Sequence, residues 1–254
     1  MNRLSICVIT FNEAHDLPRL LKSVEGIAEE IVVVDSGSTD ATTEIARAAG
    51  ARVLTRAWTN YAEQKNYAAA QASEDWILLL DADEELSDEL RKSILKWKAS
   101  PAQFAVYEMA RLAWFLGAWI HHSRWYPDFQ RRLYDRRKAQ FSGAIHESLQ
   151  FQGAVGRLRG DLLHYTARSL EEQRNKSEEY STLSARAMFE SGRRDWRAAK
   201  WFATPWTWIR YFVLGAGFLD GYRGFMIARS AAHTVWLKYT KLGELVEQAA
   251  REKQ

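Results

Sequence analysis

The first hundred residues alternate short apolar runs with helical patterns, and this alternation limits the fold more than any other feature. Apolar, β-rich runs predict strands at Leu4–Thr10, Ile31–Val34, Arg52–Leu54 and Trp76–Leu80. Helical patterns lie between and after these runs, at Leu17–Val24, Asp40–Ala49, Tyr61–Ala72 and Ser87–Leu95. Strands that alternate with helices form a mostly parallel central sheet with helices on both faces. The sequence therefore predicts an α/β fold.

Polar clusters follow three of the expected strands. They are Thr10–Glu13, Asp35–Asp40 and Asp81–Glu85. In a parallel sheet, ligands bind beyond the carboxyl ends of the strands, so we expect the three clusters to converge on one crevice. Ser38, Thr39 and Asp40 are expected to cap the second helix.

The pattern changes twice after the first hundred residues. Residues 104–163 are typical of strands and loops, and the chain after Ser169 is helical in pattern to its end. We expect breaks in this helical part at Pro205, Gly215, Gly217, Gly221 and Gly224. We place a boundary near residue 165, which separates residues 1–165 from a helical extension at 166–254.

Composition and charge limit the classes of protein to which this chain can belong. The 254 residues carry a formal charge of +3, far below the basic excess of a protein that binds nucleic acid electrostatically. The single cysteine, Cys7, lies in an apolar run, which favours core packing and a reducing compartment. No secretory signal is recognisable, and no apolar run reaches the ~20 residues of a spanning helix, so we expect a cytoplasmic protein.

Two aspartates at the end of the fourth expected strand predict a metal site. Asp81 and Asp83 flank Ala82 where the strand gives way to a loop, so both carboxylates can reach one divalent cation. Hard oxygen ligands suit Mg²⁺ or Mn²⁺, and such an ion commonly bridges carboxylates to phosphate oxygens. The alternative is that these acids merely cap the helix that starts near Ser87.

The ends of the first two strands predict a nucleotide pocket. Asp35 ends a buried strand and is followed by a glycine turn and a helix start, which favours nearby anionic groups. Phe11 follows the first strand and is able to stack on a nucleobase. The alternatives are an ordinary turn with a good cap, and a Phe11 that belongs to the core.

Four short motifs in order resemble glycosyltransferase family 2. They are Ile9–Glu13, Val34–Asp40, Gln64–Asn66 and Leu80–Glu84. The resemblance implies the GT-A fold of nucleotide-diphospho-sugar transferases, a UDP-sugar donor, a divalent metal and inversion at the anomeric carbon. Residues 1–100 would then be the nucleotide-sugar half and residues 101–165 the acceptor half of the catalytic domain.

The resemblance also implies roles for individual residues. The expected nucleotide-sugar contacts are Thr10, Phe11, Glu13, Asp35, Ser36, Lys65, Asp81 and Ala82. Asp83 would be the direct metal ligand, with Asp81 beside it. Two departures concern the base of the donor: Ser36 stands where many members have a second acid, and Lys65 stands where arginine is frequent.

Motifs in the second half are similar to one branch of that family. They are Trp125–Asp128, Arg131–Tyr134, Phe141–Glu147 and Gly217–Phe225. They resemble the WaaE-type enzymes, which glucosylate the inner core of lipopolysaccharide. This resemblance implies glucose from UDP-glucose as donor and a lipid-linked saccharide as acceptor.

An inverting transfer needs a carboxylate that accepts the proton of the acceptor hydroxyl. Glu147 best matches the family's acidic base, with His146 beside it to orient the carboxylate or contact the metal. The alternative for Glu147 is a surface ion pair with Arg131 or Arg132. These two arginines are also expected to bind the donor diphosphate or acceptor phosphates, and Asp128 to bind acceptor hydroxyls.

The helical extension interleaves basic and aromatic residues. The set is Arg193, Arg194, Arg197, Lys200 and Arg210 with Trp196, Trp201, Phe202, Trp206, Trp208 and Phe212. This pattern is typical of a helix in a membrane interface, here the inner face of the cytoplasmic membrane. A helix packed on its own domain is the alternative, and the sequence favours neither.

Two other functions share part of this sequence pattern. A nucleotidyltransferase also uses a parallel sheet and paired aspartates, but it would carry a glycine-rich loop after the first strand, and Phe11–His15 contains no glycine. A non-catalytic glycan-binding relative would not need to keep Asp81, Asp83 and Glu147 together.

Overall fold

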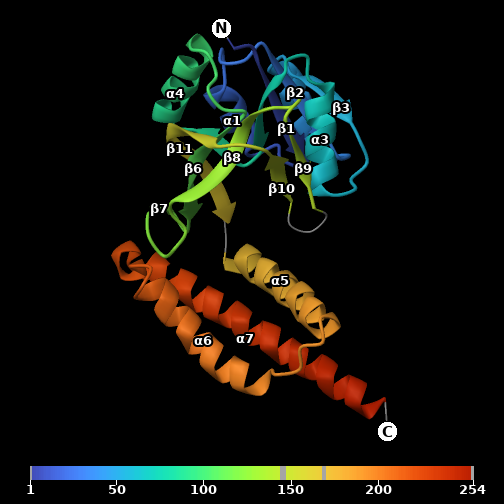
Figure 1. Cartoon of the computed structure of the whole chain (residues 1–254), viewed down its shortest axis with the longest axis vertical. Helices are drawn as coiled ribbons and strands as arrows, with labels where there is room; N and C mark the ends of the chain where they lie inside the picture. Colours follow the sequence, from blue (N-terminus) through green and yellow to red (C-terminus); the bar gives the residue numbers. More distant parts are fainter. Residues whose placement is uncertain (1, 144–146, 168–169, 253–254) are drawn as a thin grey trace. The chain divides into compact units, whose positions relative to one another are not determined.

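A computed structural model describes residues 2–143, 147–167 and 170–252 (Figure 1). The chain divides into two compact units. Unit 1 consists of Met1–Leu112 and Asp128–His164, and unit 2 consists of Ala113–Pro127 and Tyr165–Gln254.

Unit 1 begins with the predicted alternation of strands and helices. In order these are β1 (Leu4–Thr10), α1 (Leu17–Ser23), β2 (Glu30–Asp35), α2 (Thr42–Ala48), β3 (Arg52–Thr55), α3 (Tyr61–Gln71) and β4 (Trp76–Asp81). Next come β5 (Glu84–Leu86), α4 (Asp88–Ala99), β6 (Val106–Phe115), β8 (Asp128–Asp135), β9 (Ala139–Ser142), β10 (Ser148–Phe151) and β11 (Val155–Ala167). Strand β7 (Ala118–Ile120) follows β6 in the chain and belongs to unit 2, as do the last residues of β6 and β11. The strands and helices predicted for the first hundred residues are confirmed to within a few residues.

One large sheet organises these strands. Among the described residues its order is β3-β2-β1-β4-β8-β6-β11-β5, with β7 paired to β6. The pairs β3–β2, β2–β1 and β1–β4 are parallel. Antiparallel strands from the later part of the chain extend this parallel half, starting with β8 beside β4. The predicted α/β fold is confirmed.

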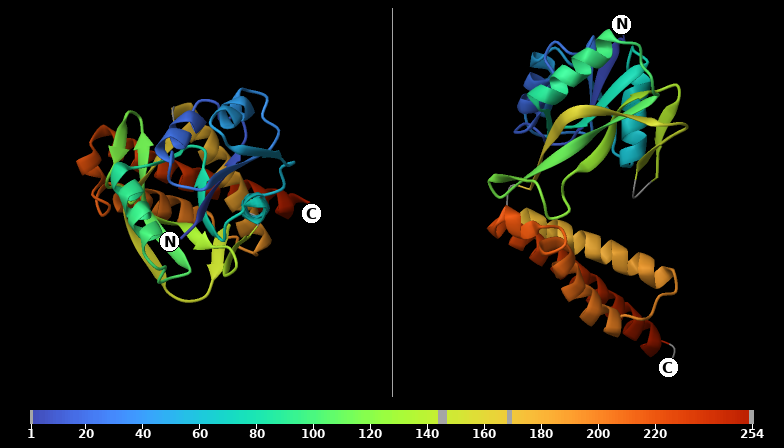
Figure 2. Two further views of the ribbon diagram at one scale, coloured as in Figure 1. Left: turned by 90° about the horizontal axis from the view of Figure 1, so that it is seen from above. Right: turned by 60° about the vertical axis from the view of Figure 1, so that its left-hand side comes forward.

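The core lies on both faces of the parallel strands, which explains why those strands are apolar throughout. In β1, Leu4, Ile6 and Val8 face one core cluster with α1 and α4, whereas Cys7 and Ile9 face another with α3. Figures 1 and 2 show α3 and α4 on opposite sides of the sheet. Because both faces are covered, every residue of β1 is buried.

Two of the helix starts differ slightly from the prediction. The helix predicted from Ser87 begins at Asp88, and Ser87 caps it, since its hydroxyl accepts a hydrogen bond from Leu90 N. The second helix begins at Thr42, and Ser38, Thr39 and Asp40 precede it in a turn. Asp40 accepts a hydrogen bond from Thr42 N at 3.0 Å. Its carboxylate therefore bonds the first residue of the helix, which starts two residues later than predicted.

Unit 2 contains α5 (Leu170–Glu190), α6 (Arg197–Phe212), a 3₁₀ turn η1 (Gly217–Asp220) and α7 (Tyr222–Arg251). Helices α5 and α6 both pack on α7. The core of this packing includes Ala185, Tyr239 and Leu242. Among the helices that the structure describes, none combines the length and apolar character needed to cross a bilayer.

Two of the predicted helix breaks in unit 2 are wrong. Helix α6 continues through Pro205, because its packing along α7 outweighs the ~3 kcal/mol cost of an internal proline. Gly224 lies inside α7, where a Cβ would come within 1.8 Å of the Gly217 carbonyl oxygen. This glycine therefore permits a close approach of η1 and does not end the helix. Gly215, Gly217 and Gly221 do lie between or at the ends of helical segments.

Candidate active site

The carboxyl ends of β1, β2 and β4 lie side by side, as predicted. Thr10 is the register partner of Asp35, and Ile9 is the partner of Asp81. The three polar clusters therefore meet at one edge of the parallel half of the sheet.

The buried carboxylate of Asp35 organises the turn after β2. Its Oδ2 accepts hydrogen bonds from Gly37 N and Ser38 N at 2.9 and 2.8 Å, and its Oδ1 accepts one from the Thr10 hydroxyl at 3.0 Å. The next residue, Ser36, accepts a hydrogen bond from Gln64 Nε2 at 3.1 Å. These bonds fix the ends of β1 and β2 relative to each other.

The turn after β1 is bonded to the same segment. Asn12 has a φ of 57°. Its backbone N–H donates to the Ser38 hydroxyl, and its side-chain oxygen accepts from Thr39 N, both at 2.8 Å. Glu13 N donates to the Thr42 hydroxyl at 2.8 Å. Phe11 is 58% exposed, so the alternative that it belongs to the core is wrong, and its ring is available for stacking.

Asp81 lies in a buried charge network. Its carboxylate pairs with Arg132 Nη2, and Arg132 also contacts Glu84 Oε1 at 2.5 Å. Glu84 Oε2 accepts a hydrogen bond from Asp81 N at 3.0 Å. Burial alone would raise the pKa of Asp81, but the positive charges of Arg132 and Lys65 outweigh it and hold that pKa well below its usual range.

Lys65 on α3 joins this network to Glu147. Its buried ammonium lies 3.3 Å from Asp81 Oδ1 and 3.0 Å from Glu147 Oε1. The partner of Glu147 is thus Lys65, and neither Arg131 nor Arg132 contacts it among the described residues. A single cation therefore holds the predicted base beside the first aspartate of the pair.

Asp83 has a different neighbour, which the sequence analysis missed. His164 Nε2 lies 3.1 Å from Asp83 Oδ2. The antiparallel pairing of β11 with β5 places His164 opposite Glu84, one residue from Asp83. A histidine that ends an apolar strand run, Leu162-Leu163-His164, was the available signal.

The remaining predicted residues are distributed around this network. Asp128 accepts hydrogen bonds from Arg111, the shorter at 2.6 Å, and Arg111 lies 3.6 Å from Glu84. Arg131 is exposed and stacks over the Phe151 ring at 5.1 Å. Ala82 is buried in the core, and His146 lies outside the described residues.

The donor set at Asp83 fits a divalent ion. A carboxylate and an imidazole are both ligands of Mn²⁺-type cations, and a metal held by one or two carboxylates is commonly completed by substrate phosphates and water. The described residues contain no group of three or more His, Cys, Asp or Glu side chains arranged around a metal. Asp83 and His164 would therefore hold an ion together with a ligand that brings its own oxygens.

The sequence is similar to known glycosyltransferases. Residues 5–158 match the model of "Glycosyl transferase family 2". An uncharacterized glycosyltransferase of Rickettsia typhi is 33% identical over 261 residues, which cover 96% of this chain and 88% of that protein. The lipopolysaccharide core biosynthesis glycosyltransferase LpsC of Rhizobium meliloti is 32% identical over 247 residues, which cover 94% of this chain and 91% of that protein.

Solved structures give more distant similarities. Glucosyl-3-phosphoglycerate synthase of Mycobacterium tuberculosis, in complex with Mn²⁺, UDP and glucosyl-3-phosphoglycerate, aligns with a TM-score of 0.49 and 16% identity. That alignment covers 76% of this chain and 81% of the synthase chain. TarS of S. aureus, residues 1–349, aligns over 99% of this chain and 92% of its own with a TM-score of 0.48 and 14% identity.

Proposed function

The chain belongs to glycosyltransferase family 2, and from this premise we propose that it transfers glucose from UDP-glucose onto an inner-core sugar of lipopolysaccharide or a similar glycolipid. The observation that supports the proposal is the link from Asp81, two residues from Asp83, through Lys65 to Glu147 in unit 1. Asp81 and Glu147 share the cation Lys65, so a donor and a base would lie on neighbouring sides of one buried network.

The donor half of this site has an exposed ring and a fixed turn. Phe11 would stack on the nucleobase, and the loops tied together by Asn12 and Ser38 would cradle the ribose. Asp83 and His164 would hold the divalent ion, which supplies positive charge to the departing diphosphate when it is bound. The negative charge of Asp81 is already compensated by Arg132 and Lys65, which leaves Asp83 as the better ligand.

The acceptor half needs a proton acceptor. In the proposed step the acceptor oxygen forms a bond to C1 of the hexose, the bond from C1 to the donor phosphate breaks, and Glu147 takes the hydroxyl proton. Lys65 bonds Oε1 of Glu147, so in the described part of the chain Oε2 has no competing donor. Attack from the face opposite the leaving group inverts the anomeric carbon.

The similarity to LpsC, which is named for lipopolysaccharide core biosynthesis, supports this acceptor class. A lipid-linked acceptor would place the enzyme at the cytoplasmic surface of the inner membrane. Asp128 and Arg131, in the less buried first half of β8, are the candidates for contacts with acceptor hydroxyls and phosphates.

The test is turnover of UDP-glucose with isolated lipopolysaccharide core as acceptor. We expect UDP release that needs Mg²⁺ or Mn²⁺ and a product heavier by one hexose. Asp83→Asn and Glu147→Gln should each lower kcat by about 100-fold or more. Asp88→Asn, an exposed aspartate in the first turn of α4, is the matched control and should keep full activity.

Four results would contradict this function or the residues assigned to it. Full activity in Asp83→Asn would remove the metal assignment, and full activity in Glu147→Gln would remove the base. Release of pyrophosphate from a nucleoside triphosphate and a sugar phosphate would instead identify a nucleotidyltransferase. If UDP with Mn²⁺ gave no thermal stabilisation, a non-catalytic relative would be favoured, because a ligand of the folded state must stabilise it.

A further inference from the structure

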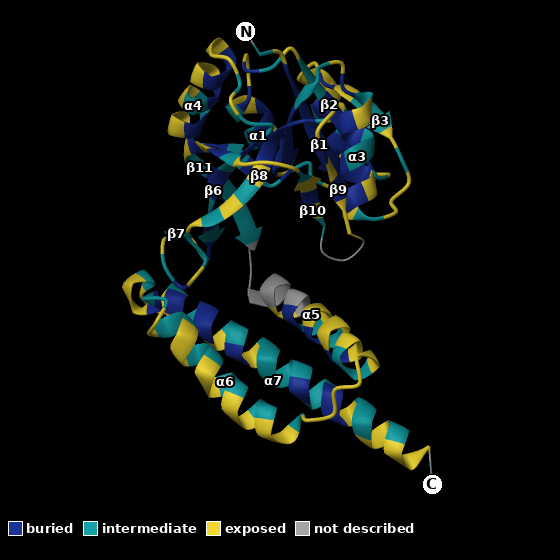
Figure 3. Ribbon diagram, in the orientation of Figure 1, coloured by how far each residue is buried: buried dark blue, intermediate teal, exposed yellow. Residues whose placement is uncertain are grey.

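Helix α6 carries its apolar stripe on the outside. Phe202, Trp206, Ile209 and Val213 follow one another at intervals of four, three and four residues, so they lie on one face of the helix. All four side chains are exposed, Phe202 to 74% and Trp206 to 56%. Figure 3 shows exposed and intermediate surface along the whole of α6, which has no buried residue.

The packed face of α6 is made of other residues. Ala199 and Ala203 contact the core of α5 and α7, and Tyr211 contacts the cluster around Ile227. The stripe is therefore additional to the residues that hold α6 in place. Aromatic rings outside the stripe also contact α7, since Trp201 lies against Trp236 and Phe212 against Phe225. An amphipathic helix normally buries its large apolar residues, and the four residues of the stripe are left exposed.

The chain beyond α6 continues this exposed apolar surface. The exposed side chains are Leu214, Phe218, Leu219 and Tyr222, in and around η1. Soluble monomers seldom expose this many large apolar side chains within one short segment, and such patches mark partner or membrane surfaces.

The charged side chains of residues 196–219 are all positive. Arg197, Lys200 and Arg210 lie in α6, and residues 196–219 contain no aspartate or glutamate. A second copy of this chain bound symmetrically through the stripe would bring these cations against one another, which opposes self-association. An anionic surface would complement them.

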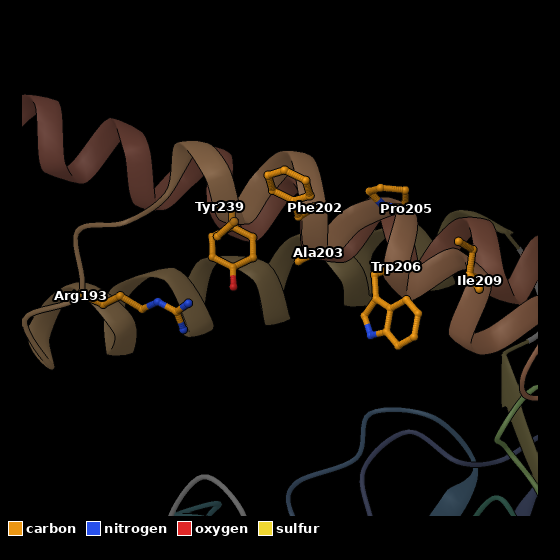
Figure 4. A pocket seen from close by; sticks show the side chains of 8 residues that line it. Arg193, Phe202, Ala203, Pro205, Trp206, Ile209 and Tyr239 are labelled. Atoms are coloured by element: carbon orange, nitrogen blue, oxygen red, sulfur yellow. The ribbon is translucent and has the colours of Figure 1, made fainter.

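A shallow groove connects the stripe with Arg193, whose guanidinium pairs with the exposed carboxylate of Asp195 at 2.9 Å. Phe202, Trp206 and Ile209 line it together with Tyr239 of α7, and its volume is about 580 Å³. Figure 4 shows Arg193 reaching towards the Tyr239 ring, with the guanidinium carbon 5.7 Å from the ring centre. An apolar groove that ends at an arginine suits an acyl chain beneath a phosphate headgroup.

We propose that the outward face of α6, with the groove beside it, binds the headgroup region of an anionic phospholipid bilayer and lies parallel to the membrane plane. Aromatic residues above an apolar face and lysine or arginine at its edges are the features of interfacial helices. This inference rests on the proposed function only for its choice of a membrane as partner, and it assigns a surface in unit 2 that no catalytic residue occupies.

The test is sedimentation of the whole protein with vesicles of phosphatidylcholine alone or with one quarter phosphatidylglycerol. We expect binding to the anionic vesicles that weakens as salt rises, because part of it is electrostatic. The double variant Phe202→Ser/Trp206→Ser should bind about tenfold more weakly or not at all. Arg197→Gln/Arg210→Gln should also lose about tenfold on anionic vesicles.

Trp58→Ser is the matched control, since Trp58 is an exposed tryptophan in unit 1. It should bind vesicles like the unchanged protein. Equal binding by the Phe202/Trp206 variant, or a wild-type protein that ignores anionic vesicles, would overturn the proposal, as would a dimer that this double variant dissociates. Vesicle binding needs no sugar transfer, so an inactive but membrane-bound protein would contradict the proposed function alone.

Discussion

Asp81 and Asp83 are separated by one residue, yet their carboxylates have different neighbours. Asp81 contacts Arg132 and Lys65, whereas Asp83 contacts His164. A carboxylate between two buried cations is held ionised and fixed in place, which suits a positioning role. The carboxylate beside the imidazole is the one that we propose as the metal ligand.

The first prediction concerns the pH dependence of Asp81. Its pKa is lowered in the folded protein from an ordinary value of 3.8, so its ion pairs stabilise the fold above that pH and lose their effect as the pH falls below it. Asp81→Asn should be less stable than wild type by roughly 2–4 kcal/mol at pH 7. Below pH 3.8 this gap should narrow by about 1 kcal/mol per pH unit.

Urea unfolding of both proteins at pH 7, 5 and 3.3 measures the gap. The other acidic groups are present in both proteins, so their contribution to the pH dependence cancels when the two free energies of unfolding are subtracted. A gap of the same size at all three pH values would show that the ion pairs of Asp81 do not titrate as stated.

The second prediction concerns Lys65, which we regard as a positioning residue. Lys65→Met leaves Asp81 and Glu147 without their common cation, so kcat should fall about 100-fold. Lys65→Arg should recover activity to within about tenfold, because a guanidinium can bridge two carboxylates. If Lys65 had only a structural role, Lys65→Met and Lys65→Arg would lose stability equally, and the folded fraction of each variant would keep its kcat. Stability, kcat and KM are therefore measured separately for each variant.

At the residue scale, the sequence predicted which side chains meet but not how they pair. The parallel register follows from apolar runs, and it brings Thr10, Asp35 and Asp81 together as expected. The partners of Asp83 and Glu147 come from β11 and α3, and their proximity depends on packing between distant segments. Periodicity carries no information on such contacts. Arg132 shows this most clearly, since an expected phosphate ligand is a buried partner of Asp81 and Glu84.

At the scale of elements, local propensity was a good guide in unit 1 and a poor one in unit 2. Strands β1, β2 and β4 bury side chains on both faces, so their continuous apolar runs predict their place inside the sheet, whereas β3 at the end of the sheet has no fully buried residue. Pro205 and Gly224 are breakers by propensity, but packing against α7 and η1 decides their structure. The cost of a proline is fixed, whereas the compensating contacts depend on the partner helix.

The third prediction belongs to the loop before β8 and its contact with η1. The buried carboxylate of Asp220 accepts hydrogen bonds from His122 N at 3.2 Å and from the Ser123 hydroxyl at 2.8 Å. Ser123 and the following Arg124 both have positive φ, a costly conformation that these bonds help to hold. Asp220→Ala should therefore lower the free energy of unfolding of unit 2 by roughly 2–4 kcal/mol.

Tryptophan fluorescence during urea unfolding measures this loss. Asp195→Ala is the matched control in the same unit, because Asp195 is exposed and pairs only with Arg193 among the described residues. It should leave the unfolding midpoint unchanged. Equal midpoints for the two variants would show that Asp220 does not hold the loop.

On the scale of the whole molecule, the two units differ in what stabilises them and in what they are proposed to bind. Unit 1 has a core on both faces of a sheet and contains every described group assigned to the donor. Unit 2 is built from helices packed on α7 and exposes the apolar stripe. We therefore expect the two units to unfold as separate steps.

The chain carries a native probe for each step. Cys7 is buried in β1 of unit 1, and burial raises the pKa of its thiol to about 12, so it should react with a thiol reagent at pH 8 only after unit 1 opens. Of the eleven tryptophans, those outside unit 1 are Trp114, Trp119, Trp125, Trp196, Trp201, Trp206, Trp208 and Trp236. Fluorescence therefore reports mainly on unit 2.

The last prediction combines the two probes with the donor. UDP and Mn²⁺ at about 100 times their dissociation constant should stabilise unit 1 by about 2.7 kcal/mol, because they bind only its folded state. The urea midpoint for Cys7 labelling should rise, and the midpoint of the fluorescence change should stay where it was. Asp83→Asn should abolish the shift in Cys7 labelling. If both midpoints rose together by the same amount, the two units would unfold as one, and donor binding would be coupled to the helices of unit 2.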